Sequence, residues 1–528
     1  MALTLTGTVV TFDRSRPLID PGAVFVGDDG RLAAVGRAAD PPPAGFANAP
    51  RIDTGSVIYP GLIDLHNHFA YNILPLWRAK GVPYIHHDRW PDETKAPAYS
   101  TSVTWPARVL GQAAPEALLK YVEVKALVGG TTSIQGAPLS TRPVDGWLLR
   151  IVDDEKLPGG KDLVMCAALQ RDISELRRNV KRTGVADKLD DGQVMIYHAA
   201  EGQHRVVGPG DFDVAGEFDD LASSGCLQPG LIGVHATALE PVDFALWRDE
   251  VKAIDPNQKP SLVWSPFSNY WLYHATTDVI EADKKGFRIC LGSDWSPSGT
   301  KHVLGELKVA DALNRGPFGG RFSDLELCEM VTANPGDALA VAWGPQIGRL
   351  RAGNAADILV CERHDADPYR NLIEATEQHV RLVLVRGIPF YGTRPLMTAA
   401  GVQAPNLITI RGQQRALIVR QPGRQDATLD WPGVRAALEA VRNDPQAAWQ
   451  GSLDALAAWG GALDDPEAPL ALYGDMPEGD LGLLGASGEI PADLVIPPLQ
   501  SLTHDAAFLA AVAAAGPPEL QALRSYYT

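Results

Sequence analysis

Two histidines separated by one residue, His66 and His68, stand at the end of an apolar run that begins at Gly61. Alternate residues of a β-strand point to the same side, so both imidazoles can reach one ion. Neutral histidine is a common ligand for zinc. The pair therefore predicts two metal ligands at the end of a buried strand, although either residue could by itself be a satisfied core histidine.

Three later apolar runs also end in a side chain that can bind a metal. They lead into His198, His235 and Asp294, and Glu201 follows three residues after His198. A core histidine explains His198 or His235 better when each is taken alone. The repetition of the pattern at four strand ends instead predicts one shared site.

The elements that would position these side chains repeat along the middle of the chain. Apolar runs without alternation are typical of strands buried on both faces, and helical spacing between them, as at 117–128, predicts crossover helices. Eight such runs predict a closed (β/α)8 TIM barrel over residues 61–345: 62–65, 131–134, 147–152, 163–169, 193–197, 231–234, 262–264 and 289–291. Barrel enzymes carry their chemistry at the carboxyl ends of the strands, where the four candidate residues stand.

The flanks of the barrel region differ from it. Residues 1–60 and 346–395 contain short β-rich runs and turns, which predict a small composite β-sandwich domain built from both flanks. Residues 401–528 contain no Lys, no Cys and one histidine, His504, with 15 acidic and 7 basic residues. This C-terminal extension could be a lid over the barrel, a dimer element or a solubilising appendage.

Composition excludes several classes of protein. With 45% hydrophobic and 21% charged residues, the chain of 528 residues can bury a large core. Its net charge of −17 argues against nucleic acid as a main partner, and no apolar run of about 18 residues predicts a membrane span. The start of the chain lacks the pattern of a secretory signal, and five cysteines spread singly favour a reducing compartment, so we expect a cytoplasmic protein.

The motifs together resemble those of the amidohydrolase superfamily, in the branch that holds cytosine deaminase and the triazine hydrolases. The resemblance runs in order through residues 1–395. It rests on 53–68, 130–132, 198–201, His235, 292–294, 334–335 and the return into the β-domain at 347–358.

The resemblance implies one divalent metal ion, zinc ahead of iron or manganese. It assigns the metal to His66, His68, His198 and Asp294. Glu201 would shuttle protons, His235 would orient or polarise the substrate, and Asp294 would have a second, catalytic role in accepting a proton.

The implied activity is hydrolysis of a non-peptide C–N bond in a small molecule: an amide, a cyclic amide or an amino group on a heterocycle. One alternative is displacement of halide or another leaving group from a heteroaromatic ring. A non-catalytic relative that only binds a ligand is a third, and we expect a homo-oligomer in each case.

Departures from the family pattern bear on the metal count and on specificity. The fourth predicted strand ends at 169–171 without the lysine that usually bridges two metals, which favours one ion. Gln135, Trp264 and Trp295 are candidate substrate contacts. The insertion 69–105, rich in Trp, Tyr and His, could be an aromatic lid or an ordinarily packed loop.

Overall fold

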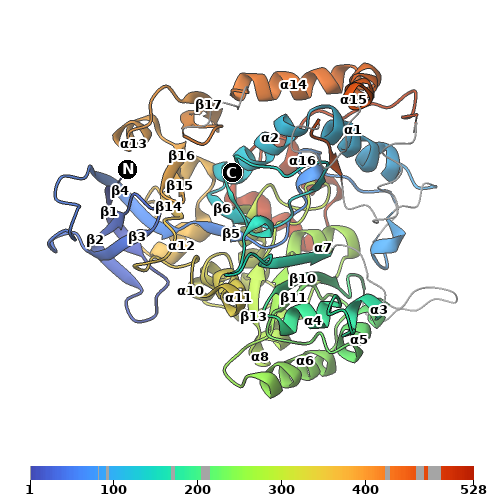
Figure 1. The fold of residues 1–528 in the computed structure, drawn as a ribbon, viewed down its shortest axis with the longest axis horizontal. Helices are drawn as coiled ribbons and strands as arrows, with labels where there is room; N and C mark the ends of the chain where they lie inside the picture. The colour runs from blue at the N-terminus through green and yellow to red at the C-terminus, as the bar shows by residue number, and fades with distance from the viewer. Residues whose placement is uncertain are drawn as a thin grey trace.

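The computed structural model describes residues 2–80, 83–90, 94–167, 173–203, 214–422, 429–459, 469–473 and 489–528 (Figure 1). Its centre is mixed α/β, with two sheets in which every pair of neighbouring strands is parallel. A further, mostly antiparallel sheet lies beside them.

The two parallel sheets contain eight strands, and each overlaps one of the predicted runs. The five-stranded sheet has the order β13-β12-β11-β10-β9 and the three-stranded sheet the order β5-β6-β8. The strands are β5 Leu62–Asp64, β6 Thr131–Ile134, β8 Arg150–Ile151, β9 Val164–Ala167, β10 Val194–Ala199, β11 Leu231–His235, β12 Ser261–Trp264 and β13 Arg288–Leu291.

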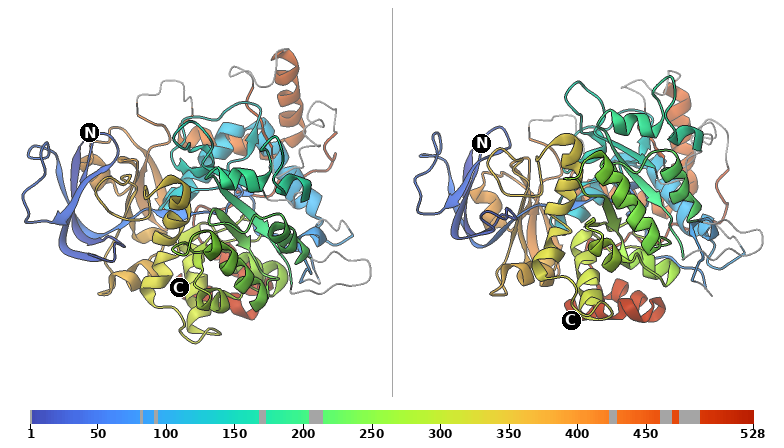
Figure 2. Two further views of the ribbon diagram at one scale, coloured as in Figure 1. Left: turned by 60° about the horizontal axis from the view of Figure 1, so that its bottom comes forward. Right: turned by 90° about the horizontal axis from the view of Figure 1, so that it is seen from below.

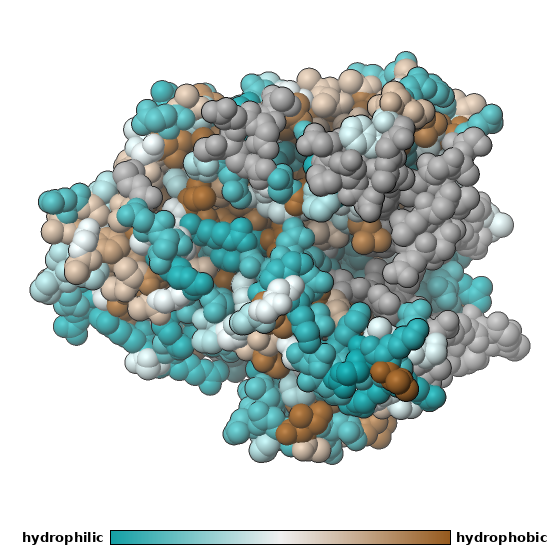
Figure 3. Space-filling model, viewed as in Figure 1, coloured by the Kyte–Doolittle hydropathy of each residue, from teal (hydrophilic) through white to brown (hydrophobic). Residues whose placement is uncertain are grey.

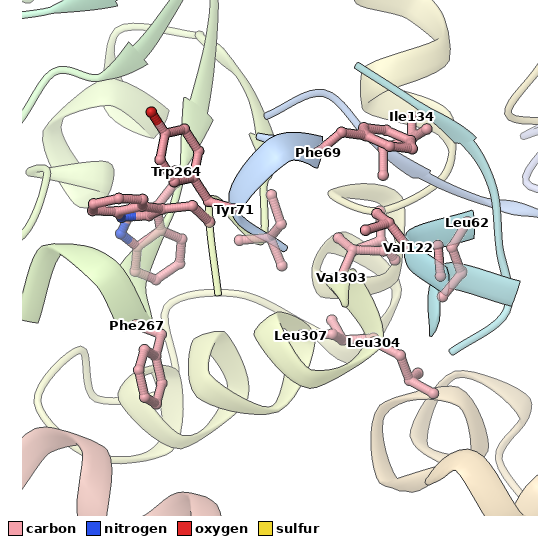
Figure 4. Close-up of a cluster of buried hydrophobic side chains, with 14 of the residues drawn as sticks. Leu62, Phe69, Tyr71, Val122, Ile134, Trp264, Phe267, Val303, Leu304 and Leu307 are labelled. Atoms are coloured by element: carbon pink, nitrogen blue, oxygen red, sulfur yellow. The ribbon is translucent and has the colours of Figure 1, made fainter. Parts of the chain in front are cut away.

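These strands are buried because helices cover them. All residues of β11 and β12 are buried, as expected for apolar runs without alternation. The helices lie outside the strands (Figures 1 and 2): α2 Pro115–Val128, α4 Val185–Asp190, α5 Gly216–Ser223, α6 Pro241–Ile254, α8 Val279–Lys284, α9 Val303–Arg315, α10 Asp324–Glu329 and α11 Ala333–Trp343. Leu62 of β5, Val122 of α2 and Leu304 of α9 belong to the core that joins strands to helices (Figure 4).

The two parallel sheets meet where β5 and β13 end. Asn67 and Asp294 form an isolated parallel bridge, and the Asp294 N–H donates to the carbonyl of His66 at 2.9 Å. The carboxyl ends of the first and last of the eight strands are thereby joined.

The flanks of the chain share one nine-stranded sheet, at the left of Figure 1, with the order β17-β18-β16-β15-β14-β4-β1-β2-β3. Its strands are β1 Leu3–Val10, β2 Leu18–Val26, β3 Leu32–Arg37, β4 Arg51–Pro60, β14 Ile358–Cys361, β15 Val380–Val385, β16 Ile388–Gly392, β17 Asn406–Ile410 and β18 Gln413–Leu417. Antiparallel pairing of β14 with β4 joins the two flanks. The hairpin β17–β18 carries the sheet past residue 395, into the predicted extension.

Other described elements of the extension pack on helices of the central region. Its elements are α14 Trp431–Asn443, α15 Pro445–Trp459, β19 Leu472–Tyr473, α16 Ala506–Ala515 and the 3-10 helix η7 Pro518–Tyr526. Trp431 stacks on Tyr121 of α2 with ring centroids 5.5 Å apart, and Phe508 of α16 stacks on Phe267 at 5.7 Å. Figure 2 shows α16 and η7, in red, against the helices of the central region.

Shorter elements complete the chain. They are β7 Leu139–Ser140, which pairs with β19, α1 Trp105–Ala113, α3 Ile173–Leu176, α7 Pro266–Tyr273, α12 Pro368–Glu374, α13 Arg394–Ala399, the π-helix η3 Ser100–Thr104 and the 3-10 helices η1 Phe69–Tyr71, η2 His87–Arg89, η4 Val152–Asp154 and η5 Glu377–His379. Within the described ranges, no helix has the length and apolarity needed to cross a membrane. Hydrophilic residues cover much of the face in Figure 3, with hydrophobic ones in small groups.

A buried ion pair between β8 and the start of β14 links the parallel strands to the nine-stranded sheet. The Arg150 Nε lies 2.8 Å from Asp357 Oδ2, and both side chains are less than a tenth exposed. We expect Asp357→Leu to lower the free energy of unfolding by about 3 kcal/mol, because it leaves part of a buried charge unpaired. Urea denaturation measures this change.

The exposed pair Arg351–Asp13 is the matched control, since it also joins distant segments but is open to water. Arg351→Ala should cost less than about 1 kcal/mol. Equal losses in the two variants would contradict the assigned importance of the buried pair.

Candidate metal centre and hydrolytic site

Side chains from three of the parallel strand ends converge on one buried point. The Nε2 atoms of His66 and His68 lie 3.0 and 3.4 Å from Asp294 Oδ1. The Nε2 atom of His198, on β10, lies 3.3 Å from that of His66. The possible ligand atoms of His66, His68 and His198 all lie within 4.8 Å of one another. The structure thus brings together every residue that the sequence predicted as a metal ligand.

The protonation states favoured by burial suit a cation at this point. Burial lowers the pKa of His66 to about 4 and that of His198 well below its ordinary range, so both rings are neutral at pH 7. Burial raises the pKa of Asp294, but the neighbouring His66 and His68 outweigh it and hold that pKa well below the ordinary value. A donor set of three imidazole nitrogens and one carboxylate fits a divalent cation with an open position.

The backbone turns sharply at the ends of these strands. His235 and Asp294 have positive φ angles of 63° and 58°, and Ala200 and Ala236 have 53°. Such angles are uncommon for residues other than glycine and are often found at functional sites. The left-handed turns lie at, or next to, the residues that carry the candidate chemistry.

Glu201 lies beside the converging ligands, as the proton-transfer role implies. Its Oε1 atom is 3.5 Å from His235 Nε2 and accepts a hydrogen bond of 2.7 Å from the Tyr273 hydroxyl. Burial raises the pKa of Tyr273 well above its ordinary value, so this phenol remains a donor. Sequence reasoning missed Tyr273, because it stands at the end of α7, nine residues after β12, with no motif to mark it.

The orientation of His235 is set by a second residue that the sequence analysis did not assign a role, Asn269. The amide nitrogen of Asn269 faces the hydroxyls of Thr276 and Thr277 at 3.3 and 3.4 Å, so its Oδ1 faces His235 Nδ1 at 2.9 Å. His235 therefore carries a proton on Nδ1, and its Nε2 atom faces the carboxylates of Glu201 and Asp294.

The buried carboxylate of Asp64 holds the ends of β5 and β13 together through hydrogen bonds. It accepts from the Ser293 N–H at 3.1 Å, the His66 N–H at 3.3 Å and the Asn67 side-chain amide at 3.3 Å. Burial raises the pKa of Asp64 to about 6, despite these hydrogen bonds. Asp64 belongs to the first sequence motif, but the sequence alone did not indicate that its carboxylate accepts hydrogen bonds from both strand ends.

The three candidate substrate contacts lie in different surroundings. Gln135 is buried, with its amide placed to bond the backbone of Leu65 and Gly136. Trp264 is buried, and its indole N–H donates to the Thr276 hydroxyl at 2.7 Å. Trp295 is beside the metal ligands, with its ring centroid 6.5 Å from that of His68. A role in substrate binding stays a prediction for all three.

Part of the aromatic insertion packs around Trp295. Tyr71, Trp90 and Tyr99 have ring centroids 5.3, 5.4 and 6.1 Å from that of Trp295. The His87 N–H donates to the carbonyl of Glu201 at 3.3 Å, and its ring pairs with Glu217 at 2.7 Å. The described part of the insertion is therefore attached to the segment that carries Glu201.

A second buried group, His302, Glu377 and His504, also has the composition of a metal site. The Lys301 N–H donates to His504 Nε2 at 3.1 Å, so the ring proton is on Nδ1, which donates to Glu377 Oε1 at 2.7 Å. Both nitrogens of His504 are thereby used. The geometry describes a hydrogen-bonded contact between the extension and the central region.

The expectation of one metal ion depends on residues 169–171, at the end of the fourth predicted strand. These residues lie outside the described ranges, and the metal count stays a prediction.

No protein-family model matches the chain. A curated relative, the 5-methylthioadenosine/S-adenosylhomocysteine deaminase of Thermoanaerobacter pseudethanolicus, is 30% identical over 132 residues. The match covers 24% of this chain and only 30% of that relative's length.

Two similar solved structures hold zinc. The atrazine chlorohydrolase of Arthrobacter aurescens is 16% identical with a TM-score of 0.57, over 83% of this chain and 99% of that one. The adenosine deaminase of Xanthomonas campestris is 16% identical with a TM-score of 0.57, over 84% and 98%. At these identities the likeness concerns the fold.

The assignment of His235 can be tested directly. In metal-free protein, ¹⁵N NMR of the imidazoles should show His235 protonated on Nδ1. We expect Asn269→Leu to populate the Nε2-protonated form, because the acceptor that fixes Nδ1–H is lost.

Asn334→Leu is the control, since the Asn334 amide bonds the carbonyl of Ile289 and no site residue. An unchanged Nδ1–H signal of His235 in the Asn269 variant would show that Asn269 does not set the tautomer.

The fold agrees with the resemblance found in the motifs: the chain is similar in fold to a triazine hydrolase, an adenosine deaminase and a guanine deaminase.

Proposed function

We propose that this protein is a metal-dependent hydrolase that cleaves a non-peptide C–N bond in a small molecule. His66, His68, His198 and Asp294 hold one divalent cation, zinc ahead of iron or manganese. The observation that carries the proposal is the convergence at one point, beside Glu201, of three imidazoles, two of them neutral at pH 7, and an ionised carboxylate.

The names of the similar proteins support this reaction class. The curated relative and one zinc-bound neighbour are deaminases, which release an amino group. The other zinc-bound neighbour is a chlorohydrolase, which favours halide displacement from a heteroaromatic ring as the second candidate. Both reactions use water as the nucleophile, so the site geometry serves either.

The protein's own side chains can move the protons that the reaction requires. A bound divalent cation supplies Lewis acidity and activates water near neutral pH. Glu201 can take a proton from the attacking water and deliver it to the leaving nitrogen. Tyr273 holds the Glu201 carboxylate in place, and His235 presents Nε2 to the same space. Asp294 can assist as a second proton acceptor.

The finer architecture also belongs to this proposal. The three-stranded and five-stranded sheets together make the eight strands of a TIM barrel over 61–345, and the Asn67–Asp294 bridge supports its closure. Residues 1–60 and 346–395 form the composite β-sandwich domain, to which the hairpin β17–β18 adds two strands, and the remainder of 401–528 is the extension.

Metal content tests the ligand set. The purified protein should contain about one equivalent of a divalent metal, and His198→Ala should lose it, because one of four ligands is removed. Elemental analysis after dialysis gives the stoichiometry. His364→Ala, at an exposed histidine, should keep the metal, and equal retention in both variants would contradict the proposed centre.

Glu201→Gln tests proton transfer. It should bind metal normally but lose about 10²–10⁴-fold in turnover, the usual worth of general acid–base catalysis. The assay screens amides, lactams, aminoheterocycles and haloheterocycles for released ammonia, amine or halide, which also identifies the bond.

The exposed Glu362→Gln is the matched control. Full activity of the Glu201 variant on a substrate that the wild type hydrolyses would rule out its assigned role.

A further inference from the structure

We infer that the C-terminal extension positions the metal ligands through Gln500. A buried chain of hydrogen bonds runs from Gln500 through Lys125 and Asn72 to Asn67, the residue between His66 and His68. The inference rests on the proposed metal site, and it gives the extension a role in the chemistry of that site.

Gln500 is held firmly at the start of this chain. Its N–H donates to the carbonyl of Ile73 at 2.9 Å, and the Tyr121 hydroxyl donates to its carbonyl. Its side-chain oxygen accepts from Lys125 Nζ at 3.1 Å. The side chain is buried, so water cannot easily replace it as a partner.

Lys125 connects Gln500 to Asn72 by hydrogen bonds. Its Nζ donates to the carbonyl and the side-chain oxygen of Asn72 at 2.6 and 3.3 Å, as well as to Gln500. Burial lowers the pKa of Lys125 well below its ordinary value, and three oxygen acceptors surround its Nζ atom. Loss of the Gln500 oxygen would leave a buried donor without a partner, which is costly enough to displace the side chain.

Asn72 reaches the metal ligands directly. Its amide nitrogen donates to the side-chain oxygen of Asn67 and lies 3.4 Å from the carbonyl of Asp294. Asn67 in turn donates to Ser293 Oγ at 3.1 Å and forms the backbone bridge to Asp294. A shift of Asn72 therefore moves the turn that aims His66 and His68 at Asp294.

A second set of contacts, made by His504, holds the segment that carries Gln500 in place. Four residues later, the N–H and Nδ1 of His504 both donate to Glu377 Oε1, at 2.8 and 2.7 Å. The ring of His504 fits against Gly305, where a Cβ atom would approach it to 2.4 Å. The extension is thus held at Gln500 itself and again four residues later, at His504.

Zinc affinity of the metal-free, full-length protein tests the inference. Within the described part of the chain, the Nε2 atom of Gln500 has no hydrogen-bond partner. Gln500→Glu therefore keeps the hydrogen bond from Lys125 Nζ, and Gln500→Leu removes it. We expect Gln500→Leu to weaken Zn²⁺ binding roughly tenfold, measured with a competing chelator, as outer-shell substitutions typically do. Gln500→Glu should stay within about threefold of the wild type.

Gln521→Leu is the control inside the extension, because the described partners of the Gln521 side chain are the carbonyls of Val512 and Gly516. It should bind Zn²⁺ like the wild type. If Gln500→Leu does not fold, Lys125→Met interrupts the same chain from α2 and should show the same weakening.

The outcomes separate this inference from the proposed function. Failure of the wild type to bind Zn²⁺ tightly overturns the proposed metal centre and the inference with it. Tight binding by the wild type with unchanged affinity in Gln500→Leu, or in Lys125→Met where that variant replaces it, overturns the inference alone. Equal weakening in Gln500→Leu and Gln521→Leu also overturns it, because the effect would then be a general loosening of the extension.

Discussion

The joining of β5 to β13 at Asn67 and Asp294 is the constraint on which the site depends. His66 and His68 lie on either side of Asn67, so the bridge that pairs Asn67 with Asp294 also sets the distances among these three ligands. Asp64 secures the joint by accepting hydrogen bonds from both sides of it. The remaining ligand, His198, then needs only the parallel register of β10 with its neighbours to reach the same point.

Burial gives this joint its chemical character. Removing His66 and His198 from water favours their neutral forms, which are the forms that bind metals. The same burial would make the charge of Asp294 costly without a compensating positive group. A divalent cation would both bind the neutral imidazoles and balance the charge of Asp294. Glu201 lies close enough to exchange protons with water at this point. Burial of the strand ends thus accounts for the metal-binding form of the histidines and for the need to balance the charge of Asp294.

The strands and the residues at their ends are largely predictable from sequence, because strands buried on both faces appear as continuous apolar runs. All eight runs contain parallel strands, and His66, His68, His198, His235 and Asp294 stand at or just after strand ends, where parallel strands bring them to one edge. The closure of these strands as one barrel stays a prediction. The extent of the nine-stranded sheet was not foreseen, because the hairpin at 406–417 joins it only through tertiary pairing.

The residues that contact the site residues from other elements were not predictable from the sequence, because no local pattern marks them. Asn269 and Tyr273 reach the site from α7, where no periodic spacing marks a residue that bonds His235 or Glu201. Lys125 and Gln500 are 375 positions apart in the chain, and nothing local in either segment indicates that they meet. A polar residue that acts through a buried partner is visible only when the partner is known.

The most direct test of the central claim is an anomalous diffraction map recorded at the zinc absorption edge from crystals of the zinc-loaded protein. We expect one strong peak within bonding distance, about 2.0–2.2 Å, of His66, His68, His198 and Asp294. A peak at His302, Glu377 and His504 instead, or no ordered zinc at the four predicted ligands, would contradict the account.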